Sequence, residues 1–98
     1  MSKDPSLERY SRQMRFAGIL EKGQRKLLES RVTLCGCGAL GTVIANMLAR
    51  AGVGHLIIAD RDFIEMTNLQ RQVLFDEDDV KNGIPKAEAA KQKIAKIN

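Results

Sequence analysis

Residues 32–60, VTLCGCGALGTVIANMLARAGVGHLIIAD, decide the fold class that the sequence predicts. The short apolar runs at residues 32–35 and 55–59 each predict a buried strand. Between them, apolar side chains recur at helical spacing over residues 39–51, and Gly52 stands where a helix C-cap is expected. A strand, a helix and a strand in this order predict a right-handed βαβ unit, whose parallel strands are covered by helices.

The helix predicted over residues 39–51 has one apolar face, which we expect to point toward the core. This face consists of Leu40, Ile44, Met47, Leu48 and Ala51. A closing helix is predicted over residues 86–97, with lysines opposite a second apolar stripe. That stripe consists of Ala87, Ala90, Ile94 and Ile97.

Helical spacing also occurs before the first strand. A first helix is expected to end near Arg15, with Arg12 lying off its apolar stripe. A second helix is expected over residues 21–29, where it would bury Leu27 and Leu28.

The segment between the second strand and the closing helix is irregular and polar. It covers residues 62–86, with short helical turns expected over residues 68–72 and 76–80. We interpret this segment as a functional loop, because loops on a rigid scaffold often carry binding residues.

The composition fits one globular domain. Of 98 residues, 44% are hydrophobic and 29% are charged. The net charge of +4 comes from scattered Lys and Arg, so no basic arm indicates a nucleic-acid partner. No stretch approaches the roughly 18 apolar residues of a membrane span. Because Cys35 and Cys37 are the only cysteines, we expect no disulfide framework or zinc site, and we expect a cytoplasmic protein.

A glycine motif lies between the predicted strand and the predicted helix. Gly36, Gly38 and Gly41 form the pattern G-x-G-x-x-G. Glycines let the backbone turn tightly and approach phosphate oxygens, while the helix start offers N–H groups and the positive end of a dipole. Asp60, about 20 residues later, is placed to accept hydrogen bonds from ribose hydroxyls. These features predict a nucleotide site without specifying the nucleotide.

Two further segments do not belong to the dinucleotide fingerprint. They are residues 67–72, TNLQRQ, and Lys86 at the end of GIPK. A dehydrogenase needs a hydride acceptor, whereas attack of a carboxylate on an α-phosphate needs cations that neutralise charge on the triphosphate. Arg12, Arg71 and Lys86 are cations of the required kind. They favour a triphosphate site if the fold brings them together.

In these motifs the chain resembles the ThiF, MoeB and HesA adenylyltransferases, which are related to ubiquitin-activating enzymes. The resemblance runs from Arg9-Tyr10-Ser11-Arg12-Gln13 through the glycine motif to the NLQRQ and GIPK segments. It implies a Rossmann-like α/β fold with three αβα layers and parallel strands. It also implies ATP-dependent adenylylation of the C-terminal carboxylate of a ubiquitin-like or sulfur-carrier protein.

Under this resemblance the chain is the ATP-binding part of a single adenylation domain. A helical arm over residues 1–30 would precede a βαβ nucleotide-binding unit over residues 31–98. We expect the chain to end after the first βαβ unit of such a domain. The aspartate that holds Mg²⁺ in the family would lie beyond Asn98, so no metal ligand is expected within the chain.

The resemblance also implies roles for individual residues. The nucleotide would lie along Gly36, Gly38, Ala39, Gly41, Asp60, Thr67, Asn68, Leu69, Gln70, Arg71 and Lys86. Among these, Asn68, Arg71 and Lys86 would contact the phosphates. Arg12 would reach the active site of a partner subunit as an arginine finger, which implies a homodimer. Ala39 stands where the family often has another glycine, and its methyl group would lie near the phosphates.

Two other functions remain open at this point. The glycine motif and Asp60 also fit a fragment of an NAD-binding oxidoreductase. A two-stranded sheet exposes an edge that another copy could cover, which fits a non-catalytic dimerisation or binding module. Cys37 is either a reactive thiol at a helix N-terminus or a small residue that fits the loop.

Overall fold

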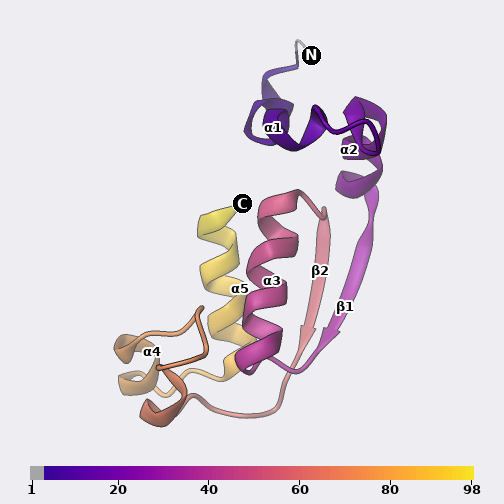
Figure 1. Cartoon of the computed structure of the whole chain (residues 1–98). Helices are drawn as coiled ribbons and strands as arrows, with labels where there is room; N and C mark the ends of the chain where they lie inside the picture. Colours follow the sequence, from indigo (N-terminus) through magenta and orange to yellow (C-terminus); the bar gives the residue numbers. More distant parts are fainter. Residues whose placement is uncertain (1–3) are drawn as a thin grey trace.

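The βαβ unit predicted from the sequence forms the centre of the molecule (Figure 1). The computed structural model describes residues 4–98. Its elements are η1 (Pro5–Tyr10), α1 (Ser11–Met14), α2 (Leu20–Glu29), β1 (Arg31–Cys35), α3 (Ala39–Ala51), β2 (His55–Ala59), η2 (Met66–Asn68), α4 (Glu77–Lys81) and α5 (Lys86–Ile97). Strands β1 and β2 are parallel, and Arg31 pairs with His55 at one end of the ladder. The predicted α/β class with parallel strands is therefore confirmed.

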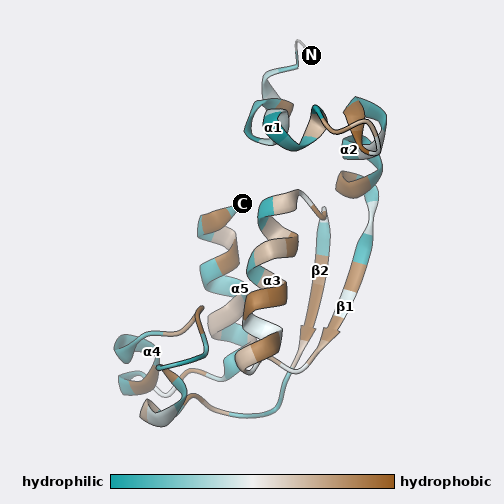
Figure 2. Ribbon diagram, viewed as in Figure 1, coloured by the Kyte–Doolittle hydropathy of each residue, from teal (hydrophilic) through white to brown (hydrophobic). Residues whose placement is uncertain are grey.

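The two long helices, α3 and α5, lie on the same face of the sheet (Figure 1). Figure 2 shows hydrophobic residues concentrated along β2, part of β1 and α3. Alternate residues of both strands are nevertheless exposed, and Ile57 leaves 46% of its surface accessible. The prediction of buried strands is wrong for this outer face, because residues 4–98 place no helix against it.

Helix α3 packs through a different face from the one predicted. Its buried residues are Thr42, Ala45 and Ala49. Leu40 and Met47, which were expected to point inward, are 74% and 63% exposed. Small side chains allow a close approach to α5, whose Ala89 and Ala90 belong to the same buried cluster as Ala45. The spacing of large apolar residues thus predicted the helix correctly but not the side that packs.

Helix α5 keeps part of its predicted stripe. Ala90 is buried, and Ile94 and Ile97 are half-buried and pack against the core. Lys86, at the first position of the helix, is also buried, with 8% of its surface exposed. None of the helices formed by residues 4–98 is long and apolar enough to cross a membrane.

The helical arm of η1, α1 and α2 packs against the far end of α3 and α5. Of the arm predicted over residues 1–30, residues 1–3 lie outside the described residues. The Gln13 and Gln24 amides donate to the carbonyl oxygen of Ala51 at 2.7 and 3.0 Å. Asn98 donates to the Tyr10 hydroxyl at 2.8 Å. Hydrogen bonds therefore fasten the arm to the ends of both long helices.

Two local predictions for the arm need correction. The first helix is not one α-helix: it begins as a 3-10 helix and becomes α-helical only at Ser11. Leu27 and Leu28, which were predicted to be buried, are half-buried, whereas Gln24 has no exposed surface. The apolar pattern did not predict the burial of Gln24, because that burial depends on hydrogen bonds to Gln13 in α1 and to Ala51 in α3.

The segment between β2 and α5, residues 60–85, is called the crossover segment below. Its first helical turn begins at Met66 rather than at residue 68, and its second forms α4, which Asp76 caps at the N-terminus. Phe63 and Pro85 form an isolated antiparallel bridge. The crossover segment thus folds back on itself, and α5 begins near the carboxyl ends of the two strands (Figure 1).

Candidate nucleotide-binding site

The glycine loop joins β1 to α3. Gly36 has a φ of +97°, which is a conformation that favours glycine, and its N–H donates to the Ala59 carbonyl oxygen at 2.8 Å. Gly38 is the N-cap of α3 and offers no side chain to the first turn. A Cβ atom on Gly41 would lie 2.2 Å from the Gly36 carbonyl oxygen. The Gly36 backbone therefore packs closely against the first turn of α3 at Gly41, and the N-terminus of α3 has no side-chain cap.

Asp60 connects the glycine loop to the crossover segment. Its Oδ2 accepts a hydrogen bond from the Cys37 N–H at 2.7 Å, and its Oδ1 accepts one from the Asp62 N–H at 2.8 Å. Each carboxylate oxygen has a second lone pair, so Asp60 retains acceptor capacity for a ribose hydroxyl. The structure thus gives Asp60 a role in holding the loop that sequence reasoning did not anticipate.

Cys37 belongs to the glycine loop, and its side chain is fully buried. Burial raises the pKa of its thiol to about 11, the Asp60 carboxylate adds to the rise, and Lys86 acts in the opposite direction. A thiol with so high a pKa is protonated near neutral pH and is a poor nucleophile. These properties favour the interpretation that a small residue fits the loop here.

Asn68 and Lys86 lie together in one open pocket of about 460 Å³. The other residues that line it are Arg61, Asp62, Phe63 and Glu65. Asn68 is buried, and its Oδ1 accepts a hydrogen bond from the Glu65 N–H at 2.8 Å. The Lys86 N–H donates to the Asp62 carbonyl oxygen at 2.9 Å, which ties the start of α5 to the end of β2. Asn68 and Lys86, two of the residues predicted to contact the phosphates, therefore lie in the same pocket.

Arg71 does not line that pocket. It is exposed, and its guanidinium donates to the Thr67 carbonyl oxygen at 3.0 Å, within its own turn. Gln70 donates to the same oxygen at 3.3 Å, and Leu69 packs against the core. The guanidinium is thus bonded within its own turn, and contact of Arg71 with the phosphates stays a prediction.

Arg12 is exposed on α1, at the end of α3 opposite the glycine loop (Figure 1). Its neighbour Gln13 binds the carbonyl oxygen of Ala51, the last residue of α3, whereas the loop precedes Ala39, the first residue. Because α3 has 13 residues, these two ends are separated by roughly 20 Å. Arg12 therefore does not join the site of its own chain.

The profile of the ThiF family matches residues 10–98. The chain belongs to the ThiF family. The sulfur carrier protein ThiS adenylyltransferase of Bacillus subtilis (strain 168) is 58% identical over 90 residues, covering 92% of this chain and 27% of that protein. The SAMP-activating enzyme E1 of Haloferax volcanii is 45% identical over 92 residues, with 94% and 33% covered.

A solved structure has a similar fold. The crystal structure of E. coli MccB with ATP superposes with a TM-score of 0.82 and 41% sequence identity, covering 92% of this chain and 28% of that one. The ThiF-family chain thus spans 27% to 33% of the length of these three relatives. Its elements correspond to the N-terminal part of their Rossmann-like fold.

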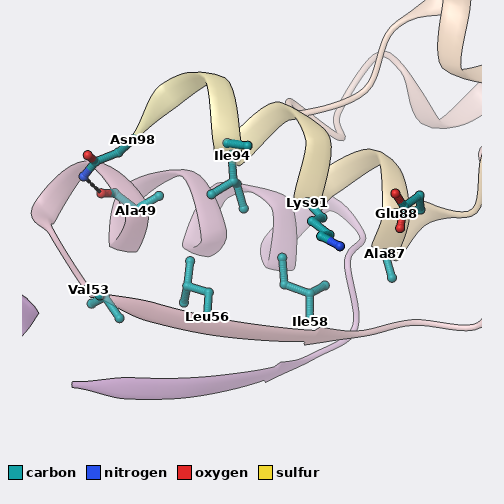
Figure 3. Close-up of a pocket in the computed structure, with 11 residues that line it drawn as sticks. Ala49, Val53, Leu56, Ile58, Ala87, Glu88, Lys91, Ile94 and Asn98 are labelled. Atoms are coloured by element: carbon teal, nitrogen blue, oxygen red, sulfur yellow. Dashed lines mark hydrogen bonds between the residues drawn. The ribbon is translucent and has the colours of Figure 1, made fainter. Parts of the chain in front are cut away.

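The ThiF-family chain has a second hollow, of about 350 Å³, between β2 and α5 (Figure 3). Leu56 and Ile58 point into it from β2, and Ile94 points into it from α5. None of the predicted site residues lines this hollow. This hollow is therefore separate from the glycine loop and from the pocket of Asn68 and Lys86.

Sequence reasoning missed Gln72. This residue ends the NLQRQ segment that carries the ThiF-family resemblance, but it was given no role. Only 4% of its surface is exposed, and its amide nitrogen lies 3.8 Å from the position that a Cβ on Gly38 would occupy. The signal available in the sequence was a glutamine inside a functional segment, which does not reveal burial.

Proposed function

We propose that residues 1–98 are the ATP-binding part of an adenylyltransferase, with a helical arm over residues 1–30 and a nucleotide-binding unit over residues 31–98. Its substrate would be the C-terminal carboxylate of a ubiquitin-like or sulfur-carrier protein. The observation that carries the proposal is the gathering of the glycine loop, Asp60, Asn68 and Lys86 at the carboxyl ends of β1 and β2. The two relatives, a ThiS adenylyltransferase and a SAMP-activating enzyme, support the substrate class.

The described residues fit the phosphates of a nucleotide. The N-terminus of α3 has no side-chain cap, and free N–H groups at a helix start bind anions. Lys86 places a cation near the loop, because its charge acts on the buried Cys37. ATP supplies the adenylyl group and a pyrophosphate leaving group. The attacking carboxylate belongs to the carrier, so the chain has to position and neutralise charge rather than provide a nucleophile.

Within residues 4–98, no three His, Cys, Asp or Glu side chains lie close enough together to hold an ion. Mg²⁺ would accompany ATP, with its main protein ligand outside residues 4–98.

The proposal includes a homodimer and a cytoplasmic location. Arg12 lies too far from the glycine loop of its own chain, so a role at the phosphates requires a second subunit. Cys35 and Cys37 are both free thiols, which is usual for proteins of a reducing compartment.

Calorimetric titration of the chain with ATP and with NAD tests the proposal. We expect ATP to bind more tightly, because the chain offers cations for a triphosphate. Lys86→Ala should weaken ATP binding about tenfold or more, since a charge-assisted contact is lost. Lys96→Ala is the matched control, because Lys96 is exposed in the last turn of the same helix.

Tighter binding of NAD would instead support the oxidoreductase alternative. A chain that binds neither nucleotide and sediments as a stable oligomer would support the binding-module alternative. In a protein that contains the complete adenylation domain, Lys86→Ala should lower carrier-dependent ATP–pyrophosphate exchange about 10²-fold.

A further inference from the structure

Two glutamines, Gln13 of α1 and Gln24 of α2, form an amide pair at the C-terminal end of α3. Both side chains donate through Nε2 to the Ala51 carbonyl oxygen, at 2.7 and 3.0 Å. Gln13 Nε2 also donates to Gln24 Oε1, so each of the three groups is bonded to the other two. A carbonyl oxygen has two lone pairs and an amide nitrogen has two hydrogens, so the Ala51 oxygen and the Gln13 nitrogen are both fully used.

The surroundings of Gln24 leave the amide pair little room to shift. Gln24 has no exposed surface. Gly52, the C-cap of α3, lies against it with a φ of +98°, and a Cβ there would overlap Gln24 Nε2 and lie 2.8 Å from a ring carbon of Tyr10. The amide pair therefore holds the arm at one position on α3.

Arg12 precedes Gln13 in the single turn of α1. Within residues 4–98, the Arg12 side chain is exposed and has no hydrogen bond or ion pair. Adjacent residues of an α-helix point about 100° apart, so Gln13 faces α3 while Arg12 points away from it. A turn of four residues is too short to be stable alone, so its direction depends on what fastens it. Gln13 fastens it to α3.

The symmetry of a dimer makes this attachment matter at two sites. A two-fold dimer joins the same pair of surfaces twice. Where the arm of each subunit lies at the glycine loop of the other, the separation of arm and loop within one chain sets the position of Arg12 at both sites. Helix α3 spans that separation, with the glycine loop before its first residue and the amide pair at its last.

We propose that Gln13 is a positioning residue for the adenylylation reaction. Its amide fixes α1 on α3, and α1 presents Arg12 to the glycine loop of a partner subunit. The inference rests on the proposed function and deepens it, by naming a residue on which the placement of Arg12 depends. A guanidinium moved away from the phosphates no longer neutralises the charge of the transition state, so the reaction slows.

ATP–pyrophosphate exchange in a protein with the complete adenylation domain tests this role. Methionine has nearly the shape of glutamine but cannot donate a hydrogen bond. We expect Gln13→Met to lower kcat about tenfold and to leave KM for ATP within about twofold, because the loss falls on the transition state. The double variant with Arg12→Ala should be no slower than Arg12→Ala alone, because both changes remove one interaction.

Gln92→Met is the matched control for this measurement. Gln92 is exposed on α5, and its side chain is bonded to Glu88 of the same helix at 3.4 Å. It has the same side chain as Gln13 but lies outside the amide pair. We expect this variant to exchange at the wild-type rate.

Mixed dimers separate an effect on the partner subunit from a general structural role. After subunit exchange with Lys86→Ala, Gln13→Met should recover about a quarter of wild-type exchange, because half of the dimers are mixed and each has one intact site. Mixed with Arg12→Ala, it should show no recovery, because both sites of the mixed dimer then lack a correctly placed Arg12. Damage by Gln13→Met to the site of its own chain predicts the reverse pattern.

Three results would overturn the inference and leave the proposed function intact: a wild-type rate in Gln13→Met, a double variant slower than Arg12→Ala, or the reverse pattern of recovery. Wild-type exchange in Arg12→Ala would overturn the role of Arg12 and the inference together. A wild-type protein without exchange activity would overturn the adenylyltransferase proposal itself.

Gln13→Glu is the second variant, should methionine prevent folding. Glutamate keeps the length and the polarity of the side chain, but a carboxylate cannot donate to the Ala51 carbonyl oxygen. We expect this variant to lose exchange as Gln13→Met does. An unchanged rate in Gln13→Glu therefore also overturns the inference.

Discussion

Cys35 and Cys37 are two residues apart but have opposite environments. Cys35 is exposed at the end of β1, whereas Cys37 is buried within the glycine loop. Burial and the Asp60 carboxylate hold the pKa of Cys37 at about 11, above its ordinary value of 9.0. Strand alternation does not explain the difference, because Cys37 lies beyond the end of β1, after the turn that Gly36 makes with a φ of +97°.

We expect a thiol reagent at pH 8 to modify Cys35 quickly and Cys37 only after unfolding. The mass of the modified chain, with and without denaturant, measures the two sites. Cys35→Ser should then give a folded chain with no fast-reacting thiol. Because the folded pKa of Cys37 is raised, the unfolded thiol ionises first, so its contribution to stability is lost as the pH rises from 9.0 to about 11. Rapid labelling of Cys37 in the folded chain would contradict this assignment.

The backbone of the site was more predictable than its side chains. A G-x-G-x-x-G pattern between a strand and a helix constrains the path of adjacent residues, so Gly36 and Gly41 have the expected local roles. The directions of Arg71 and Gln72 depend instead on how the crossover segment packs against a loop more than 30 residues earlier in the chain. No local pattern encodes that packing, so the buried glutamine was missed.

At the scale of elements, helix α3 has the bounds that the sequence predicts, because both of its ends carry local signals. Gly52 adopts a left-handed conformation with a φ of +98°, as a C-terminal glycine commonly does. The buried face of α3 could not be read in the same way. It depends on which side α5 approaches, and Ala45 is the residue of α3 that shares a buried cluster with Ala89 and Ala90 of α5.

The contact between the glycine loop and α3 leads to a prediction for two glycines. Gly41→Ala should lower the free energy of unfolding by about 1–3 kcal/mol, because its Cβ would overlap the Gly36 backbone. Gly23→Ala should raise it by about 0.5–1 kcal/mol, because alanine is a better helix former than glycine and its Cβ would lie 3.4 Å from the nearest Ile19 atom, without overlap. Thermal unfolding followed by circular dichroism measures both. Equal melting temperatures for the two variants would contradict this prediction, because they would show that the loop accommodates the Gly41 Cβ without loss of stability.

At the scale of the whole molecule, the chain is elongated. It measures 44 × 21 × 18 Å, and its radius of gyration is 15.1 Å, against roughly 13 Å for a compact domain of similar length. The arm extends beyond the βαβ unit, and the outer face of the sheet is uncovered (Figure 1). This shape keeps Arg12 far from the glycine loop of its own chain.

A mixing experiment tests whether Arg12 acts on a partner subunit. In a protein with the complete adenylation domain, Arg12→Ala and Lys86→Ala should each abolish most ATP–pyrophosphate exchange. After subunit exchange, an equal mixture should recover about a quarter of wild-type activity, because half of the dimers are mixed and each mixed dimer has one intact site. Action of Arg12 within its own chain predicts no recovery. Wild-type protein taken through the same exchange protocol is the control.

The hydrogen bond from Asn98 to Tyr10 joins residues that are 88 positions apart. Contacts of such high sequence separation close a very large loop of chain, so they form late in folding and contribute only after the intervening segments are in place. The arm should therefore dock last onto an assembled βαβ unit, and it should be the first part to detach when the protein is destabilised.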